Sequence, residues 1–294
     1  MLELYQYGNS VCAQKVRTTL AEKNLDWHAH HVDLFKSEQY HPDYLKLNPK
    51  GVVPTLVHDG RPIIESTLIC EYIDEVFPEP PLSPKNAYDR AKMRTWSKMV
   101  DDGLHEGVTE ISFSAMFRNK MKNMTNAERE SRFQNIGDPK RRDRFSSTFQ
   151  DGVDSPFVMY AIAAYEKAFR LMEQRLSDGR TWIMGENYTL ADINMMPYIA
   201  RLTYLGLIEV WIEDKPAIAD WWQRSHLLPS FKRGISDLIT TQEFIDMENF
   251  SNMYSEKKKI FNTHNVWRYY FKPLSSYKLE EVYSSQNVIF TDGK

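Results

Sequence analysis

The chain has 294 residues, a length that predicts two packed domains plus an appendage. Its 42% hydrophobic and 13% aromatic content predicts a large buried core rather than disorder. Its formal net charge of −3 gives no general electrostatic reason to bind nucleic acid or an anionic membrane. No apolar run is long enough to span a bilayer, and two cysteines, Cys12 and Cys70, exclude a disulfide framework.

The first eighty residues alternate between strand and helix patterns. Their periodicity predicts a strand, a helix, a strand, a hairpin and a helix, over residues 2–7, 10–24, 27–32, 55–64 and 66–77. Ser10 is well placed to cap the first helix. Asp59-Gly60 is a strong two-residue hairpin signal, and Pro62 marks the second arm as an edge strand because proline cannot donate to a sheet ladder.

A proline-containing stretch, Asn-Pro-Lys-Gly-Val-Val-Pro-Thr-Leu over residues 48–56, precedes the hairpin. Pro54 belongs at a sheet edge or a tight bend, which leaves the N–H and C=O of Val53 free to pair with a peptide-like ligand. Glu65 and Ser66 then offer a carboxylate, a hydroxyl and helix N–H groups. Together these residues predict a site for a small zwitterionic peptide.

A proline-rich linker over residues 78–84 ends this region, and the pattern beyond it is helical. We expect helices over residues 88–109, 159–176, 190–205 and 216–226. Thr189 and Asp192 have the spacing of a capping box. The polar segment 118–155 predicts a helix followed by a long surface loop, and residues after about Thr240 predict an aromatic-rich tail without a core pattern of its own. The aromatic cluster of this tail, Trp267, Tyr269, Tyr270 and Phe271, predicts docking rather than free disorder.

These motifs, in this order, resemble the glutathione transferase family. The resemblance lies in Ser10 ahead of Lys15-Val16-Arg17, in residues 48–56, and in Glu65-Ser66 followed by Thr67-Leu68-Ile69. It covers roughly residues 1–235. It implies an α/β plus all-α protein: a thioredoxin-like domain with a mixed four-stranded sheet over residues 1–80, an all-helical substrate-binding domain over 86–235, and an extension over 236–294.

The resemblance also implies glutathione as co-substrate, held by Gln39, Lys50, Val53, Pro54, Glu65 and Ser66. The bond before Pro54 would be cis, and Val53 would pair by its backbone with the cysteinyl part. Glu65 and Ser66 would hold the γ-glutamyl end, and Gln39 and Lys50 would lie near the glycyl end.

By the same resemblance, Ser10 is the hydroxyl that hydrogen-bonds the glutathione sulfur. A thiol has a pKa of about 8.5 and reacts as the thiolate, which a hydrogen bond and a helix N-terminus both favour. The alternative is that Ser10 only caps its helix. Cys12 could form a mixed disulfide, as in thiol-transferring relatives, although a packing role is the more common one, and Cys70 is predicted to lie in the core.

The second substrate would meet an apolar pocket in the helical half, lined by Trp96, Met99, Phe113, Met116, Phe117 and Tyr160. For each of these alone a place in the helix–helix core is the more common role, but as a group some must face the cleft. Lys140-Arg141-Arg142 with Arg144 could attract an anionic substrate, but we expect a solvated basic loop there. The histidines show no metal-ligand spacing, so no metal site is predicted.

Glu38-Gln39, His58-Asp59-Gly60 and residues 69–79 look most similar to a bacterial branch of the family that cleaves β-aryl ethers of lignin-derived aromatics. The segment 118–155 is also similar in length to that branch, whereas Asn9–Cys12 departs from its pattern. This predicts a serine-stabilised glutathione thiolate that attacks an aromatic electrophile and displaces a phenolate. The alternatives are a general conjugase of electrophiles and a non-catalytic glutathione-binding or dimer-partner subunit.

The resemblance further implies a dimer, formed with a second copy or with a paralogue. Cysteine usage and the absence of a secretory pattern favour the cytoplasm.

Overall fold

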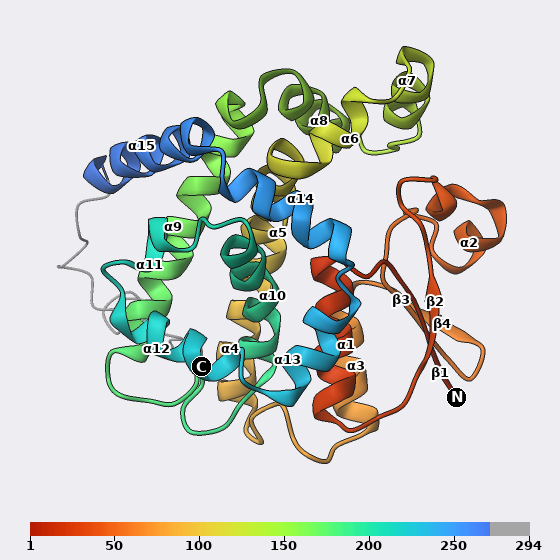
Figure 1. Ribbon diagram of the computed structural model, residues 1–294. Coiled ribbons are helices and arrows are strands. Elements are labelled where there is room, and N and C mark those ends of the chain that lie inside the picture. Colours follow the sequence, from red (N-terminus) through yellow and green to blue (C-terminus); the bar gives the residue numbers. More distant parts are fainter. Residues whose placement is uncertain (271–294) are drawn as a thin grey trace, which may run out of the picture.

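The computed structural model describes residues 1–270, without the side chains of residues 254 and 266–270 (Figure 1). Its described residues form a small part built on a sheet and a larger helical part packed beside it. The sheet has the strand order β2-β1-β3-β4, with β1 Leu2–Gln6, β2 His28–His31, β3 Thr55–His58 and β4 Arg61–Ile63. β1 and β2 are parallel and the other pairs are antiparallel, which confirms the predicted mixed four-stranded sheet.

The predicted hairpin joins β3 to β4. Asp59 and Gly60 both have positive φ, 49° and 78°, as the mirror-image turn of a two-residue hairpin requires. Pro62 lies in β4, which is an edge strand as predicted. β3 is an interior strand, so Pro54 lies at the bend that enters it, and the Val53–Pro54 peptide bond is cis, as the resemblance implied.

Three helices accompany the sheet: α1 Val11–Glu22, α2 Pro42–Leu47 and α3 Ser66–Val76. α2 has no counterpart among the predicted elements. α1 packs against α3 and also against the helical part, so its charged residues are buried and need partners. The Arg17 guanidinium donates to the side chain of Gln6 and to the carbonyls of Gly8 and Gly234, at 2.7–2.9 Å.

The helical part begins with a nearly continuous run of helix over residues 87–122. α4 Ala87–Met99, α5 His105–Ser112 and α6 Arg118–Lys122 follow one another through π-helical turns over Val100–Leu104 and Phe113–Phe117. The remaining helices here are α9 Pro156–Leu176, α10 Leu190–Tyr204, α11 Glu209–Ile212, α12 Pro216–Ser225 and α13 Pro229–Gly234. The predicted capping box at Thr189 and Asp192 is present at the start of α10.

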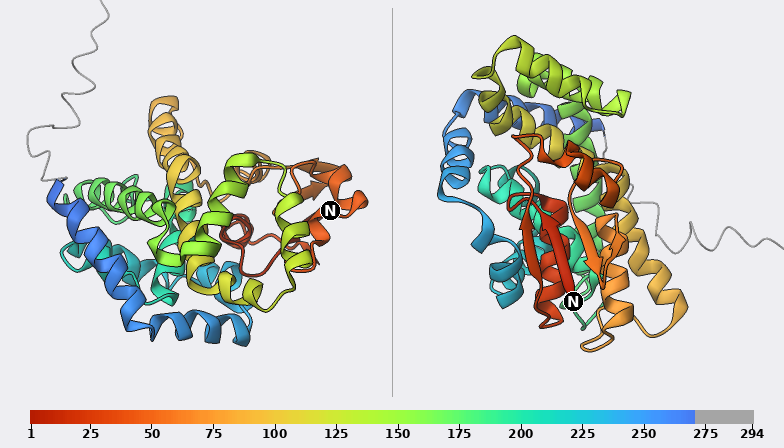
Figure 2. Two further views of the ribbon diagram at one scale, coloured as in Figure 1. Left: turned by 90° about the horizontal axis from the view of Figure 1, so that it is seen from above. Right: turned by 90° about the vertical axis from the view of Figure 1, so that its right-hand side faces the viewer.

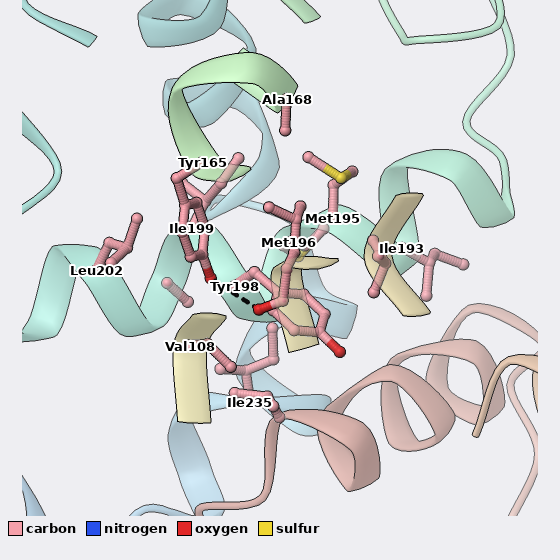
Figure 3. Close-up of a cluster of buried hydrophobic side chains, with 14 of the residues drawn as sticks. Val108, Tyr165, Ala168, Ile193, Met195, Met196, Tyr198, Ile199, Leu202 and Ile235 are labelled. Carbon is pink, nitrogen blue, oxygen red and sulfur yellow. Dashed lines mark hydrogen bonds between the residues drawn. The ribbon is translucent and has the colours of Figure 1, made fainter. Parts of the chain in front are cut away.

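The core of the helical part surrounds α10. Figure 3 shows side chains of α5, α9 and α10 gathered around Tyr198, which is fully buried. Tyr165 and Phe169 of α9 pack against Trp211, with ring centroids 5.5 and 6.1 Å apart. Within residues 1–270, no helix has the length and apolar character needed to cross a membrane.

The prediction of a helix and a long loop over residues 118–155 was wrong. This segment forms α6, α7 Asn126–Gln134 and α8 Pro139–Asp151, which reach over the sheet part near α2 (Figures 1 and 2). α7 buries none of its residues and α8 buries only Thr148. Because these helices do not pack into a core, their sequences need no apolar stripe, which is the pattern that would have predicted them. Their caps, Thr125 with Glu128 and Asp138 before Pro139, are the local signals that mark them.

The segment after about Thr240, predicted to have no core pattern of its own, contributes side chains to the core. The chain continues as α14 Thr241–Ser251 and α15 Tyr254–Tyr270, and Met247, Phe250 and Ile260 are buried. The predicted docking of the aromatic cluster falls outside the side chains that the structure describes, at Trp267, Tyr269, Tyr270 and Phe271.

Candidate active site

A cavity of about 460 Å³ lies between the sheet part and the helical part. The loops that precede α1, β3 and α3 form one wall, and α5, α7, α8 and the π-helical turn after α5 form the other. The described residues hold no cluster of three His, Cys, Asp or Glu side chains arranged for a metal ion.

The sheet-side wall brings together most of the residues predicted to hold the peptide: Gln39, Val53, Pro54, Glu65 and Ser66. Lys50 lies just outside the lining, with its ammonium 2.6 Å from Oε1 of Glu65. Val52 is fixed because its carbonyl accepts hydrogen bonds from Tyr44 and Asn48, at 2.6 and 2.9 Å. Among the described residues, neither the N–H nor the C=O of Val53 has a hydrogen-bond partner.

The backbone of Glu65 is strained. Its φ of 70° and ψ of 106° lie where side-chain-bearing residues are rare, and such conformations cluster at functional sites. Glu65 immediately precedes α3, and its carboxylate pairs with Lys50 instead of capping the helix. The first N–H groups of α3 therefore face the cavity beside the buried Ser66.

Ser10 lies in the cavity lining at the N-terminus of α1. Its Oγ accepts a hydrogen bond of 3.3 Å from the N–H of Ala13, so Ser10 is the N-cap of this helix. This bond uses an oxygen lone pair and leaves the hydroxyl hydrogen available for donation into the cavity. The capping role and the predicted role at the sulfur are therefore compatible in one side chain.

Cys12 also lines the cavity, and a histidine faces it. Its Sγ lies 3.4 Å from Nδ1 of His105 on α5 and 4.0 Å from the hydroxyl of Tyr198. Burial acts to raise the pKa of the Cys12 thiol, but the charge and hydrogen bond of His105, together with Lys15, lower it to about 6. The predicted packing role suits Cys70 instead, which is fully buried and has its pKa raised to about 11 by burial.

His105 is the functional candidate that the sequence analysis missed. Its helix presents Asp101, His105, Thr109 and Ser112 to the cavity at intervals of three or four residues. The recurrence of polar side chains at this helical spacing is the signal that could have indicated it.

The helical wall is aromatic, but only part of it was predicted. Phe113 and Phe117 line the cavity, and the ring of Phe113 stacks on Phe145 of α8 with centroids 4.9 Å apart. The other four predicted pocket residues lie elsewhere: Trp96 and Met116 in the core, Met99 against the core, and Tyr160 on the exposed surface of α9.

Charged residues share this wall. The predicted basic loop is instead part of α8, and its Arg141 and Arg144 line the cavity. Arg144 pairs with Glu106 and Glu110 of α5, at 3.2 and 3.3 Å. Burial raises the pKa of the Glu110 carboxyl to about 7, against the opposing charge of Arg144.

The loop that carries Ser10 is held from several sides. The Tyr7 hydroxyl donates to Oε1 of Glu243 on α14 at 2.5 Å, and Arg201 of α10 donates to the carbonyl of Asn9 at 2.6 Å. A Cβ added to Gly8 would meet the carbonyl oxygen of Leu238 at 2.2 Å, so no larger residue fits there. Helices from the second half of the chain thus fix the start of α1.

Comparisons with known proteins agree with this geometry. The family model described as "Glutathione S-transferase, N-terminal domain" matches residues 9–76, and the corresponding "C-terminal domain" model matches residues 145–229. Protein LigF of Sphingobium sp. is 31% identical over 241 residues, which cover 79% of this chain and 91% of LigF.

The structure of the beta-etherase LigF aligns with a TM-score of 0.71 at 29% identity, over 79% of this chain and 98% of that chain. Glutathione S-transferase Z1 of Arabidopsis thaliana is 27% identical over 80% of this chain and 92% of that protein. The tetrachloro-P-hydroquinone reductive dehalogenase of Sphingobium chlorophenolicum is 28% identical over 80% and 99%.

Proposed function

The chain belongs to the glutathione S-transferase family and uses glutathione as its co-substrate, and we propose that it cleaves the β-aryl ether bond of lignin-derived aromatic compounds. The observation that carries the proposal is the unpaired main-chain N–H and C=O of Val53, which borders a cavity with an aromatic opposite wall. The similarity to the beta-etherase LigF supports the choice of bond.

Glutathione would enter as a short added strand. Its cysteinyl amide and carbonyl would pair with the C=O and N–H of Val53. Its γ-glutamyl carboxylate would meet the N-terminus of α3 at Ser66, and its ammonium would meet Glu65. Gln39 and Lys50 would lie toward the glycyl end, leaving the sulfur near the start of α1.

Ser10 would then hold the sulfur as a thiolate. The hydroxyl hydrogen that its capping bond leaves free would donate to the sulfur, and the α1 N-terminus would favour the negative charge. Lowering the thiol pKa by about two units requires about 2.7 kcal/mol of preferential binding of the thiolate. One charged hydrogen bond with the helix dipole can provide most of this.

In the reaction, the thiolate would attack the carbon that carries the ether oxygen. A carbon–sulfur bond forms, the carbon–oxygen bond breaks, and the aryloxide leaves with its electron pair. Phe113, Phe117 and Phe145 would hold the aryl groups in line with the sulfur by face and edge contacts.

Thiol transfer is a second candidate, which the short Cys12–His105 contact favours. A thiolate at Cys12 could attack the glutathionyl sulfur of a disulfide substrate, so that a Cys12–glutathione mixed disulfide forms, the S–S bond of the substrate breaks and the other sulfur leaves as a thiolate. Glutathione would then release Cys12 by a second exchange. Two single variants, Ser10→Ala and Cys12→Ala, separate the candidates because each removes one group while leaving the other in place.

The test is an assay of phenol release from a neutral β-aryl ether with glutathione. We expect release by the wild type, a drop in kcat/KM of about 100-fold in Ser10→Ala, and little change in Cys12→Ala. Glutathione affinity, measured by calorimetry, should change little in either variant. Conjugation of 1-chloro-2,4-dinitrobenzene without phenol release would instead indicate a general conjugase, and glutathione-dependent reduction of a disulfide substrate that is lost only in Cys12→Ala would indicate thiol transfer.

We also propose that the protein works in the cytoplasm as a dimer. Leu68 of α3 and Tyr88 of α4 are large apolar side chains with exposed fractions of 57% and 68%, which a partner could cover. Sedimentation of the wild type and of a Leu68→Glu variant tests this, since a monomeric wild type would refute the dimer.

A further inference from the structure

We infer that the second substrate carries a carboxylate on its aromatic portion and that Arg141 of α8 binds it. The inference rests on the proposed function, because it specifies the substrate that occupies the same cavity. It departs from the expectation of a solvated basic segment, since Arg141 lines the cavity while its neighbour Lys140 is exposed.

The argument begins with the positive charges that border the cavity. Arg201 is buried and donates to Asn9 and to Ser112, and Arg144 is paired with two glutamates. Arg132 donates to the carbonyls of Leu34 and Phe35, at 3.0 and 3.3 Å, which are neutral acceptors. Each of these three thus has a hydrogen bond or an ion pair within the described part of the chain.

Arg141 differs from them in its contacts. Within the described part of the chain it has no ion pair and no hydrogen bond, and its guanidinium lies 5.3 Å from the centroid of the Phe145 ring. The carboxylates of the cavity already have cationic partners, since Glu65 pairs with Lys50 and Asp101 with Lys15. Glu106 and Glu110 both contact Arg144, so within the described residues Arg141 is the cavity-lining arginine left without a hydrogen bond or an ion pair.

The position of Arg141 suits a ligand attached to the glutathione sulfur. The pKa of His105 is raised chiefly by Cys12, and the charge of Arg141 acts against that rise. The pKa of Arg132 is lowered first by burial and further by Arg141. The charge of Arg141 therefore acts on both His105 and Arg132, and all three line the same cavity.

The geometry of Arg141 fits an aromatic acid. A guanidinium stacked over a phenyl ring keeps its N–H edge free, and that edge matches the two oxygens of a carboxylate. Phe145 is itself stacked on Phe113, so an aryl group held by these rings would place a ring carboxylate beside the Arg141 fork. One unpaired cation matches a single negative charge.

Binding of two glutathione conjugates tests the inference without depending on turnover. S-benzylglutathione and S-(4-carboxybenzyl)glutathione share the peptide and the ring and differ only in the carboxylate. Calorimetry with the wild type should show at least about tenfold tighter binding of the acid, as one charged hydrogen-bonded pair supplies. Arg141→Met should bind the two conjugates about equally, and Arg141→Lys should keep part of the preference.

Lys140→Met is the matched control, because it removes one positive charge from the adjacent, exposed position of α8. It should retain the full preference for the acid. Equal binding of both conjugates by the wild type, or an equal loss of both in Arg141→Met, would overturn the inference. Weaker binding of free glutathione in Arg141→Met would also overturn it, because the anion would then be a carboxylate of glutathione itself.

These outcomes are independent of the ether assay. If the neutral β-aryl ether is not cleaved while the acid preference depends on Arg141, the proposed reaction fails and the carboxylate site stands. If the ether is cleaved and the preference is absent, the reaction stands and the carboxylate site fails.

Discussion

The two walls of the cavity recognise their ligands in different ways. The sheet-side wall offers main-chain groups of Val53 and the N-terminus of α3, which turn geometry holds in place. The helical wall offers only side chains, carried on α5, α7 and α8. A constant ligand such as glutathione suits the first arrangement, and a variable second substrate suits the second, because side chains can be exchanged without altering the fold.

The largest change in glutathione affinity that tests this difference between the walls is expected at Glu65. Glu65→Gln removes the carboxylate beside the strained turn, so glutathione affinity should fall by about 10- to 100-fold. The relative affinity for the two S-benzyl conjugates should be unchanged, because that difference belongs to the other wall. Calorimetry measures both, and an unchanged glutathione Kd would refute the assignment of this wall.

The next largest effect is expected where the walls meet, at Cys12 and His105. With its pKa near 6, the Cys12 thiol is mostly ionised at pH 7, so iodoacetamide should alkylate it and leave Cys70 unmodified. His105→Gln should slow this alkylation by about tenfold, because the thiol loses its facing cation. Peptide mass mapping over a pH series provides the measurement, and equal labelling of both cysteines would contradict it.

A smaller effect is expected at the aromatic residues of the helical wall. Phe145→Leu removes the stack on Phe113, so KM for the aryl substrate should rise by about 3- to 10-fold while glutathione affinity stays constant. Phe149→Leu is the control, since Phe149 lies on the same helix outside the cavity lining. A similar rise in KM in both variants would indicate a general disturbance of α8.

The smallest effect concerns pH and stability at Glu110. Its folded pKa of about 7 lies above the unfolded value of about 4.3, so ionisation disfavours the folded state. This contribution is absent below about pH 4.3 and makes the wild type progressively less stable as the pH rises to about 7. Glu110→Gln should therefore gain about 2–3 kcal/mol relative to wild type between pH 5 and pH 8, measured by urea denaturation. A constant difference across that range would refute the shifted pKa.

The sheet-side wall was predictable because its signals are local. Ser10 was expected to cap α1, and Asp59-Gly60 was expected to turn the hairpin, and both do so. The cis bond before Pro54 also agrees with the motif. For the cap and the hairpin a few adjacent residues determine the conformation, so the sequence itself contains the necessary information, whereas the cis bond was implied by the family resemblance.

The helical wall was less predictable because the direction of its side chains depends on the two π-helical turns between α4 and α6. Each π-helical turn adds a residue to a turn of helix and rotates the following side chains relative to a regular 3.6-residue pattern. Trp96 and Met99 were predicted from their aromatic and thioether side chains, whereas the cavity receives Asp101 and His105, which lie in and after the first π-helical turn. Arg141 was assigned to solvent for a related reason, since α8 covers a cavity and not a core, and so has no apolar stripe.

The hydrogen bond between Tyr7 and Glu243 joins the start of the chain to α14, so it limits where the sequence could be cut to make a hybrid with a related protein. The family models match residues 9–76 and 145–229. Leu238 and Glu243, which contact Gly8 and Tyr7, lie beyond the second matched region. A hybrid that joined residues 1–235 to a foreign C-terminus would keep every family motif and lose this support. Recombination that preserves the site must carry the chain through to the end of α14, at Ser251.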